Sequence, residues 1–189
     1  MKLFEEKEIN KKDKQYVQSE HIDIIIKYID LSDKELNRAN IKQSYKDEDN
    51  EELKYSLRSI LQYIPWVRKI YILMPNEKVK YLKTVDEIKE KIIYIKDKDL
   101  LGFESANIQS FLFNLHKMEK FGISKNFIYM EDDYFFGKKL SKTHFFYYDL
   151  RQKKVVPYII SNKFYTMNKT DVLNNYYELF RRKESIKSY

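Results

Sequence analysis

The sequence predicts a three-layer α/β fold with a largely parallel sheet. Short apolar runs alternate with longer segments of helical periodicity, in the order strand, helix, strand, helix, strand, helix, strand. A length of 189 residues suits one domain, and a hydrophobic content of 43% is enough to build a core. No internal repeat, low-complexity tract or linker interrupts this alternation.

The first part of the chain supplies two strands and one strong helix. The run Ile22–Tyr28 (IDIIIKY) is typical of a buried strand, and the polar segment 34–48 indicates a loop or a frayed helix. Glu51–Tyr63 predicts a helix that Pro65 ends, and Val67–Leu73 predicts the second strand. The apolar face of this helix comprises Leu53, Leu57, Ile60, Leu61 and Ile64.

The second part continues the alternation. An amphipathic helix is expected over Val79–Lys91 and a short strand over Ile92–Ile95. Ser105–Phe121 predicts a second strong helix, which Gly122 is placed to end, and Phe127–Met130 predicts a fourth, buried strand. A later strand and a last helix are expected at Val155–Ile160 and Thr170–Arg182.

Composition excludes several classes of protein. The chain has 36 Lys and Arg against 29 Asp and Glu, a net charge of +7, but basic and acidic residues are interspersed in runs such as 45–52 and KDKD at 96–99. That pattern favours a solvated mixed-charge surface over nucleic-acid binding. The absence of Cys excludes disulfides and thiol chemistry. With no signal peptide or transmembrane run, we expect a cytoplasmic protein, with peripheral membrane association left open.

The sharpest chemical feature is FIYMEDDYFFG, Phe127–Gly137, in which three carboxylates follow an apolar strand directly. Three adjacent like charges repel, and at the carboxyl end of a strand they face the crevice where α/β proteins bind ligands. A divalent cation, Mg²⁺ or Mn²⁺, would neutralise them, and Mg²⁺ favours one or two carboxylates together with phosphate oxygens. Asp132 and Asp133 are therefore the candidate metal ligands. The alternative is a solvated acidic turn, which the strand before the motif and the aromatic residues after it make less favoured.

Two further clusters are weaker. Around Asn50 and Arg58, the pattern alone indicates a capped amphipathic helix, with Asp49 or Asn50 at the cap and Arg58 able to pair with phosphate. Ser105 and Asn107 lie at an expected helix start, where free backbone N–H groups suit an anion. No Ser-His-Asp set, Walker loop or GxGxxG occurs. The histidines, which we interpret as structural or surface groups, are His21, His116 and His144.

These stretches resemble the Stealth family. IDIIIKYIDLSD is similar to its first conserved block, and DNEELKYSLRSILQYIPWVRKIYIL, FESANIQSFLFNLHKM and NFIYMEDDYFFGKKLSKTHFF are similar to its second. The resemblance implies a fold similar to GT-A nucleotide-sugar transferases. It also implies transfer of hexose-1-phosphate from a UDP-sugar donor to a hydroxyl of a glycan acceptor in capsule or surface polysaccharide synthesis, with release of UMP.

The resemblance also implies roles for individual residues. Asp132 and Asp133 match the family's acidic pair, with Asp133 catalytic and the pair bound to or near Mg²⁺. The nucleotide or substrate positions that it implies are Asp30, Asp33, Asn50, Arg58, Ser105 and Asn107.

The sequence also departs from the family pattern. Glu48, Glu131 and Gln109 replace the usual Arg, Asn and Glu, and Tyr28–Leu31 lacks the usual Trp and Gly. The third and fourth blocks, which supply a His and an Arg, are not visible after Phe146. The chain would then be a truncated or diverged form, or a partner would supply the remainder.

We therefore expect an N-terminal extension over 1–20, a Stealth-like nucleotide-sugar-binding core over 21–150, and a C-terminal strand and helix segment over 151–189. Two alternatives to the sugar-phosphate transferase stay open. One is a catalytically inactive remnant that only binds, and the other is a GT-A-like glycosyltransferase that attacks the anomeric carbon and releases UDP.

Overall fold

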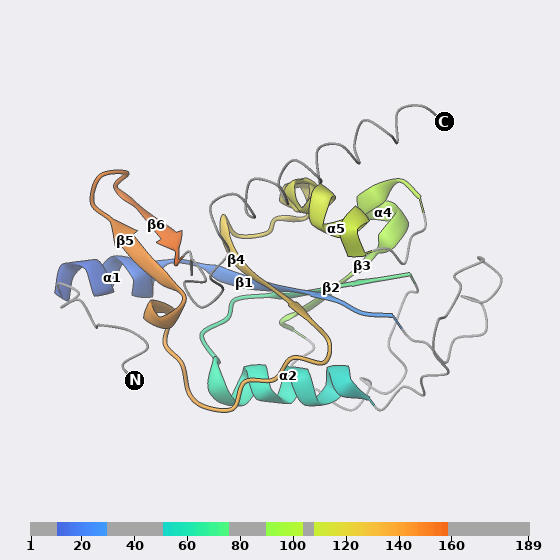
Figure 1. The fold of residues 1–189 in the computed structure, drawn as a ribbon, viewed down its shortest axis with the longest axis horizontal. Helices are drawn as coiled ribbons and strands as arrows, with labels where there is room; N and C mark the ends of the chain where they lie inside the picture. The colour runs from blue at the N-terminus through green and yellow to red at the C-terminus, as the bar shows by residue number, and fades with distance from the viewer. Residues whose placement is uncertain (1–10, 30–50, 76–89, 104–107, 159–189) are drawn as a thin grey trace, which may run out of the picture. The chain divides into compact units, whose positions relative to one another are not determined.

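The computed structural model describes residues 11–29, 51–75, 90–103 and 108–158, which all lie within one compact unit, Met1–Tyr158. Its centre is a four-stranded sheet of order β3-β2-β1-β4 in which every neighbouring pair is parallel (Figure 1). The strands are β1 (Ile22–Lys27), β2 (Ile70–Met74), β3 (Ile92–Lys96) and β4 (Asn126–Glu131). The predicted α/β class with a parallel sheet is confirmed.

Helices cover both faces of this sheet, because alternate residues of a strand point to opposite faces. Ile24 and Ile26 pack with the first helix after β1, whereas Ile25 between them packs with Phe111 on the other face. Figure 1 shows α2 on one side of the sheet and α4 and α5 on the other. The helices are α2 (Glu52–Tyr63), α4 (Asp97–Leu101), α5 (Ile108–Asn114) and the 3₁₀ helix η3 (Leu115–Phe121). This is the predicted three-layer arrangement.

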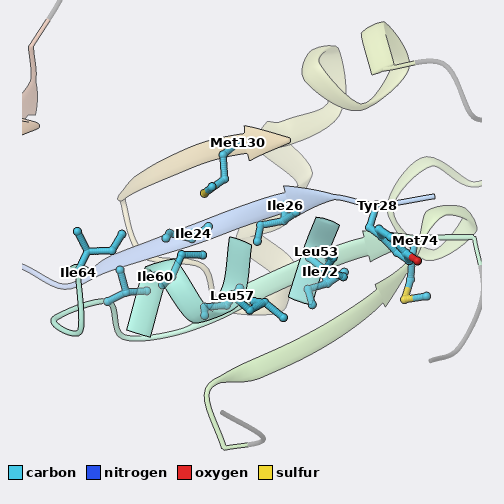
Figure 2. Packing of buried hydrophobic residues seen from close by; sticks show 12 residues of the cluster. Ile24, Ile26, Tyr28, Leu53, Leu57, Ile60, Ile64, Ile72, Met74 and Met130 are labelled. Carbon is cyan, nitrogen blue, oxygen red and sulfur yellow. The ribbon is translucent and has the colours of Figure 1, made fainter. Parts of the chain in front are cut away.

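Helix α2 buries the face that its sequence predicts. Leu53, Leu57 and Ile60 are almost fully buried against β1 and β2. Figure 2 shows Leu53 at the same end of the sheet as Tyr28 and Ile60 at the opposite end. The predicted cap at Asp49 or Asn50 is wrong: Glu51 occupies the N-cap in a left-handed conformation with φ 59°, and its side chain makes no capping hydrogen bond. The first backbone bond of α2 runs from the Lys54 N–H to the Glu51 carbonyl.

Other boundaries differ from the expectation by a few residues. Strand β2 begins at Ile70, whereas a strand from Val67 was predicted. The predicted helix that ends at Phe121 is α-helical only to Asn114 and then tightens into η3. The Asn114 amide donates to the Ser110 carbonyl at 2.7 Å, competing with the backbone bond of that turn. Gly122, with φ 77°, ends the segment as predicted.

A hairpin and a short helix pack at the amino end of β1. Val17, Ile22, Phe146 and Val155 form a separate apolar cluster, and the rings of Tyr16 and Tyr148 stack with centroids 4.4 Å apart. The elements here are α1 (Lys11–Ser19), the 3₁₀ helix η4 (Lys142–His144), and the antiparallel strands β5 (Phe146–Asp149) and β6 (Lys154–Pro157). Only β6 was predicted, as the strand from Val155.

Some expectations cannot be compared with the structure. The predicted loop at 34–48 and helix at 170–182 lie outside the described residues, as does nearly all of the predicted helix at 79–91. Among the helices that are described, none combines the length and the apolar character needed to cross a membrane.

Candidate functional site

The connections between strands place the candidate site at the carboxyl ends of β1 and β4. From β1 the chain passes through α2 to β2 on one side, whereas from β3 it passes through α4, α5 and η3 to β4 on the other side of β1. The direction of strand order thus reverses between β1 and β4. In open parallel sheets ligands bind at the carboxyl ends of the strands at such a reversal. Lys27 and Tyr28 at the end of β1 therefore border the candidate site, together with the residues that end β4.

The acidic motif lies at this position. Glu131 is the last residue of β4 and pairs in register with Lys27, the last residue of β1. Asp132 and Asp133 form the turn that follows, in which Asp132 is half-buried and Asp133 is exposed. The turn is closed by a bond from the Tyr134 backbone N–H to the Glu131 carbonyl. The predicted carboxylates therefore stand at the carboxyl end of the sheet, at the reversal of strand order.

The chain after this turn is fixed to α2. The Phe136 N–H donates to the Ser59 hydroxyl at 3.0 Å, and the Leu140 N–H donates to the Tyr63 carbonyl at 3.1 Å. Ser59 is held in turn because its hydroxyl donates to the Ser56 carbonyl at 2.7 Å. The helix that was predicted as a core element thus also holds the far end of the acidic turn.

The side chain of Lys27 lies buried beside this turn, and its role was missed in the sequence. Its ammonium nitrogen lies 2.9 and 3.1 Å from the two oxygens of Asp97, the first residue of α4. The ammonium also donates to the Tyr28 carbonyl at 3.2 Å and sits 4.3 Å from the centre of the Phe111 ring. Burial lowers the pKa of Lys27, an effect that the charges of Asp97 and Asp132 oppose.

Asp97 corrects one expectation from composition. The run Lys96–Asp99 was interpreted as solvated surface, but only 1% of Asp97 is exposed. The signal that could have found the pair is Lys27 itself, because a charge inside an otherwise buried strand requires a partner of opposite charge.

A tyrosine hydroxyl adds a second polar group on the same face. Tyr129 is the register partner of Ile25, two residues before the Lys27–Glu131 pair. Its buried hydroxyl has no hydrogen-bond partner within the part of the chain that the structure describes. Burial and the neighbouring charges of Glu131 and Asp132 raise the pKa of Tyr129 to about 12, so the hydroxyl keeps its proton at neutral pH.

The acidic pair fits one kind of metal site. Across residues 11–29, 51–75, 90–103 and 108–158, no three His, Cys, Asp or Glu side chains converge as a metal cage. Mg²⁺ commonly takes only one or two carboxylates and completes its shell with water and phosphate oxygens. Asp132 and Asp133 are the described carboxylates that could contribute to such an ion.

The remaining predicted site residues are only partly visible. Arg58 is exposed on α2, with its guanidinium 5.8 Å from the centre of the Tyr55 ring. The other predicted nucleotide or substrate residues lie outside the described residues: Asp30, Asp33, Asn50, Ser105 and Asn107. The structure thus shows where the acidic pair and Arg58 lie, and the roles of all the predicted site residues stay predictions.

Comparisons with known proteins cover this same region. A family model described as Stealth protein CR2, conserved region 2, matches residues 46–154, which is more than half of the chain and includes α2, β4 and the acidic turn. A capsular polysaccharide phosphotransferase of Actinobacillus pleuropneumoniae is 40% identical over 105 residues, which cover 52% of this chain and 27% of that protein.

Two other relatives extend the range of organisms. The alpha/beta subunits of the N-acetylglucosamine-1-phosphotransferase of Homo sapiens are 36% identical over 120 residues, which cover 61% of this chain and 9% of that protein. An exopolysaccharide phosphotransferase of Streptomyces coelicolor is 31% identical over 140 residues, which cover 66% of this chain and 22% of that protein. The matched region thus spans about a quarter of the bacterial relatives' length.

Proposed function

Because the chain belongs to the Stealth family, we propose that it forms the donor-binding part of a sugar-phosphate transferase. The donor is a UDP-hexose, and the acceptor is a hydroxyl of a capsular or surface glycan. The names of the bacterial relatives, phosphotransferases of capsular and extracellular polysaccharide, support this reaction class. The observation that carries the proposal is the position of Asp132 and Asp133 at the carboxyl end of β4, beside the reversal of strand order.

In the proposed reaction, the acceptor oxygen attacks the phosphorus that carries the sugar. The bond from that phosphorus to the bridging oxygen of UMP breaks, so that a phosphodiester forms and UMP leaves. Asp133, the exposed carboxylate, accepts the hydroxyl proton. Asp132 and Asp133 would hold Mg²⁺, which supplies charge neutralisation at the diphosphate. Arg58, also exposed, is available to pair with a phosphate or the nucleotide.

Calorimetric titration of the full chain with UDP-N-acetylglucosamine, with and without Mg²⁺, tests the donor site. We expect Mg²⁺-dependent binding that Asp133→Asn abolishes. Asp99→Asn is the matched control, because it removes an exposed carboxylate on α4 by the same substitution. Equal loss in both variants, or binding indifferent to Mg²⁺ and to Asp133, contradicts the proposal.

The product distinguishes the alternatives. Release of UMP on addition of a glycan acceptor supports phosphotransfer, whereas release of UDP supports a glycosyltransferase. Binding without either product supports the remnant that binds only. Binding of UDP without binding of UDP-N-acetylglucosamine supports the nucleotide site and indicates that the donor carries a different sugar.

A further inference from the structure

Lys27 connects the carboxyl ends of the strands around the candidate site. It ends β1, and its ammonium donates to the carbonyl of Leu73 in β2, at 3.5 Å. The same ammonium binds both oxygens of Asp97, the residue directly after β3. On the remaining side it is the register partner of Glu131 in β4, and it lies within range of the charge of Asp132.

This ammonium is too enclosed to bind a ligand directly. The side chain of Lys27 is 4% exposed and that of Asp97 is 1% exposed. Its donors already serve Asp97 and two carbonyls, and the Phe111 ring lies against it. A buried charge held in this way acts by orienting its hydrogen-bond partners. It also acts through its electric field, which is stronger where the local dielectric constant is low.

We propose that Lys27, held by Asp97, is a positioning residue of the donor site: it ties the ends of β1, β2 and β3 together beside the Glu131–Asp133 turn. Removal of the ammonium would leave the Asp97 carboxylate buried and unpaired beside the turn. The positioning role of Lys27 does not depend on the proposed function. Only its expected consequence, stronger binding of a metal–nucleotide complex, rests on that function.

Hydrogen exchange of the ligand-free full chain tests the positioning without any nucleotide. In Lys27→Met we expect faster exchange at the amides of 131–134 than in wild type, and in Lys27→Arg we expect near-wild-type protection. Arg68→Met is the matched control because it removes the cation of the other ion pair of β1, at the opposite end of the strand. A turn that exchanges at the wild-type rate in Lys27→Met overturns the proposal, as does equal local acceleration in Arg68→Met.

Titration of the same variants with UDP and Mn²⁺ measures the consequence for the site. Lys27→Met should bind about tenfold more weakly, the loss typical when a group supporting metal ligands is removed, whereas Arg68→Met should bind as wild type does. If wild type binds no nucleotide, the proposed function fails while the exchange result still decides the positioning role. If Lys27→Met does not fold, Lys27→Met/Asp97→Asn removes the pair together, and wild-type exchange in that variant overturns the proposal.

Discussion

The two ends of β1 each carry a buried charge, but the two charges are held in different ways. At the amino end, Asp23 is fully buried and accepts from Arg68 and from the backbone N–H groups of Lys69 and Ser124. At the carboxyl end, Lys27 pairs with Asp97 beside three further carboxylates. The amino end therefore has a carboxylate whose hydrogen bonds join three segments of chain. The carboxyl end keeps excess negative charge close to solvent.

The coverage of the two ends differs in the same sense. Around the amino end, α1 and the β5–β6 hairpin form an apolar cluster, and the Lys142 ammonium donates to the Gln18 carbonyl at 2.7 Å. At the carboxyl end, Asp133, Tyr134 and Phe135 are exposed. Among the described residues, β1 thus joins an end packed by apolar side chains to an end with an exposed acidic turn. Substitutions at the two ends should therefore separate stability from the proposed binding.

The largest expected effect is at the amino end. Asp23→Asn should lower the free energy of unfolding by about 3 kcal/mol, because the buried carboxylate accepts from Arg68 and from two backbone N–H groups that a neutral amide serves less well. Urea unfolding followed by the fluorescence of Trp66, the single tryptophan, measures the loss. Nucleotide binding by the folded fraction should be unchanged. A loss below about 1 kcal/mol would show that Arg68 and the backbone donors recover their hydrogen bonds from water.

The same residue predicts a dependence on pH. Burial alone would raise the pKa of Asp23, but hydrogen bonds from Arg68 and Ser124 outweigh it, so the folded-state pKa lies below the ordinary value. The ionised carboxylate therefore stabilises the fold above about pH 4, and this contribution is lost as the pH falls through the lower folded-state pKa. The stability difference between wild type and Asp23→Asn should narrow below about pH 4. A constant difference down to pH 2.5 would contradict the assignment.

A smaller effect is expected where the acidic turn is fixed to α2. Ser59→Ala should cost about 1 kcal/mol, because the Phe136 N–H loses its acceptor. Ser56→Ala is the matched control: Ser56 is also buried on α2, but its hydroxyl has no hydrogen-bond partner among the described residues. Its removal should be neutral or stabilising. Equal destabilisation of the two variants in urea unfolding would refute the anchoring role of Ser59.

The smallest change in stability is expected at the carboxyl end. Asp133→Asn should alter the free energy of unfolding by no more than about 0.5 kcal/mol, because the side chain is exposed and its removal relieves like-charge repulsion. Thermal unfolding compared with that of Asp23→Asn, the same substitution at the other end, measures the contrast. A large loss of stability at Asp133 would assign the acidic turn a structural role.

The strands of the parallel sheet and α2 could be predicted because their apolar periodicity matches their packing. Ile24–Ile26 and the Leu53–Leu57–Ile60 face are buried as that periodicity requires. Helix α1 was missed because it is almost entirely polar, with Val17 its one side chain in the core among the described residues. Strand β5 was missed because its stability comes from pairing with β6, which local sequence does not report.

Within the candidate site, the two carboxylates were predicted, but the buried ion pair beside them was not. Asp132 and Asp133 are adjacent in sequence, so a motif reveals them. Lys27 and Asp97 are 70 residues apart and meet only through the sheet. Periodicity treats Lys27 as the end of a strand and Asp97 as part of a charged run. Partners of buried charges are set by topology, which a single sequence specifies only through the whole fold.

The order in which the strands of this sheet are synthesised leaves one strand edge unpaired for a long time. Strand β1 lies between β2 and β4, and its residue Ile22 pairs with Asn126, about 100 residues later in the chain. At typical elongation rates, one edge of β1 stays unpaired for on the order of ten seconds before β4 is synthesised. During that interval a strand whose mature form is wholly buried exposes unpaired backbone and isoleucine side chains. Nascent chains that end before β4 begins at Asn126 should therefore depend on chaperones and should aggregate readily when they are released early.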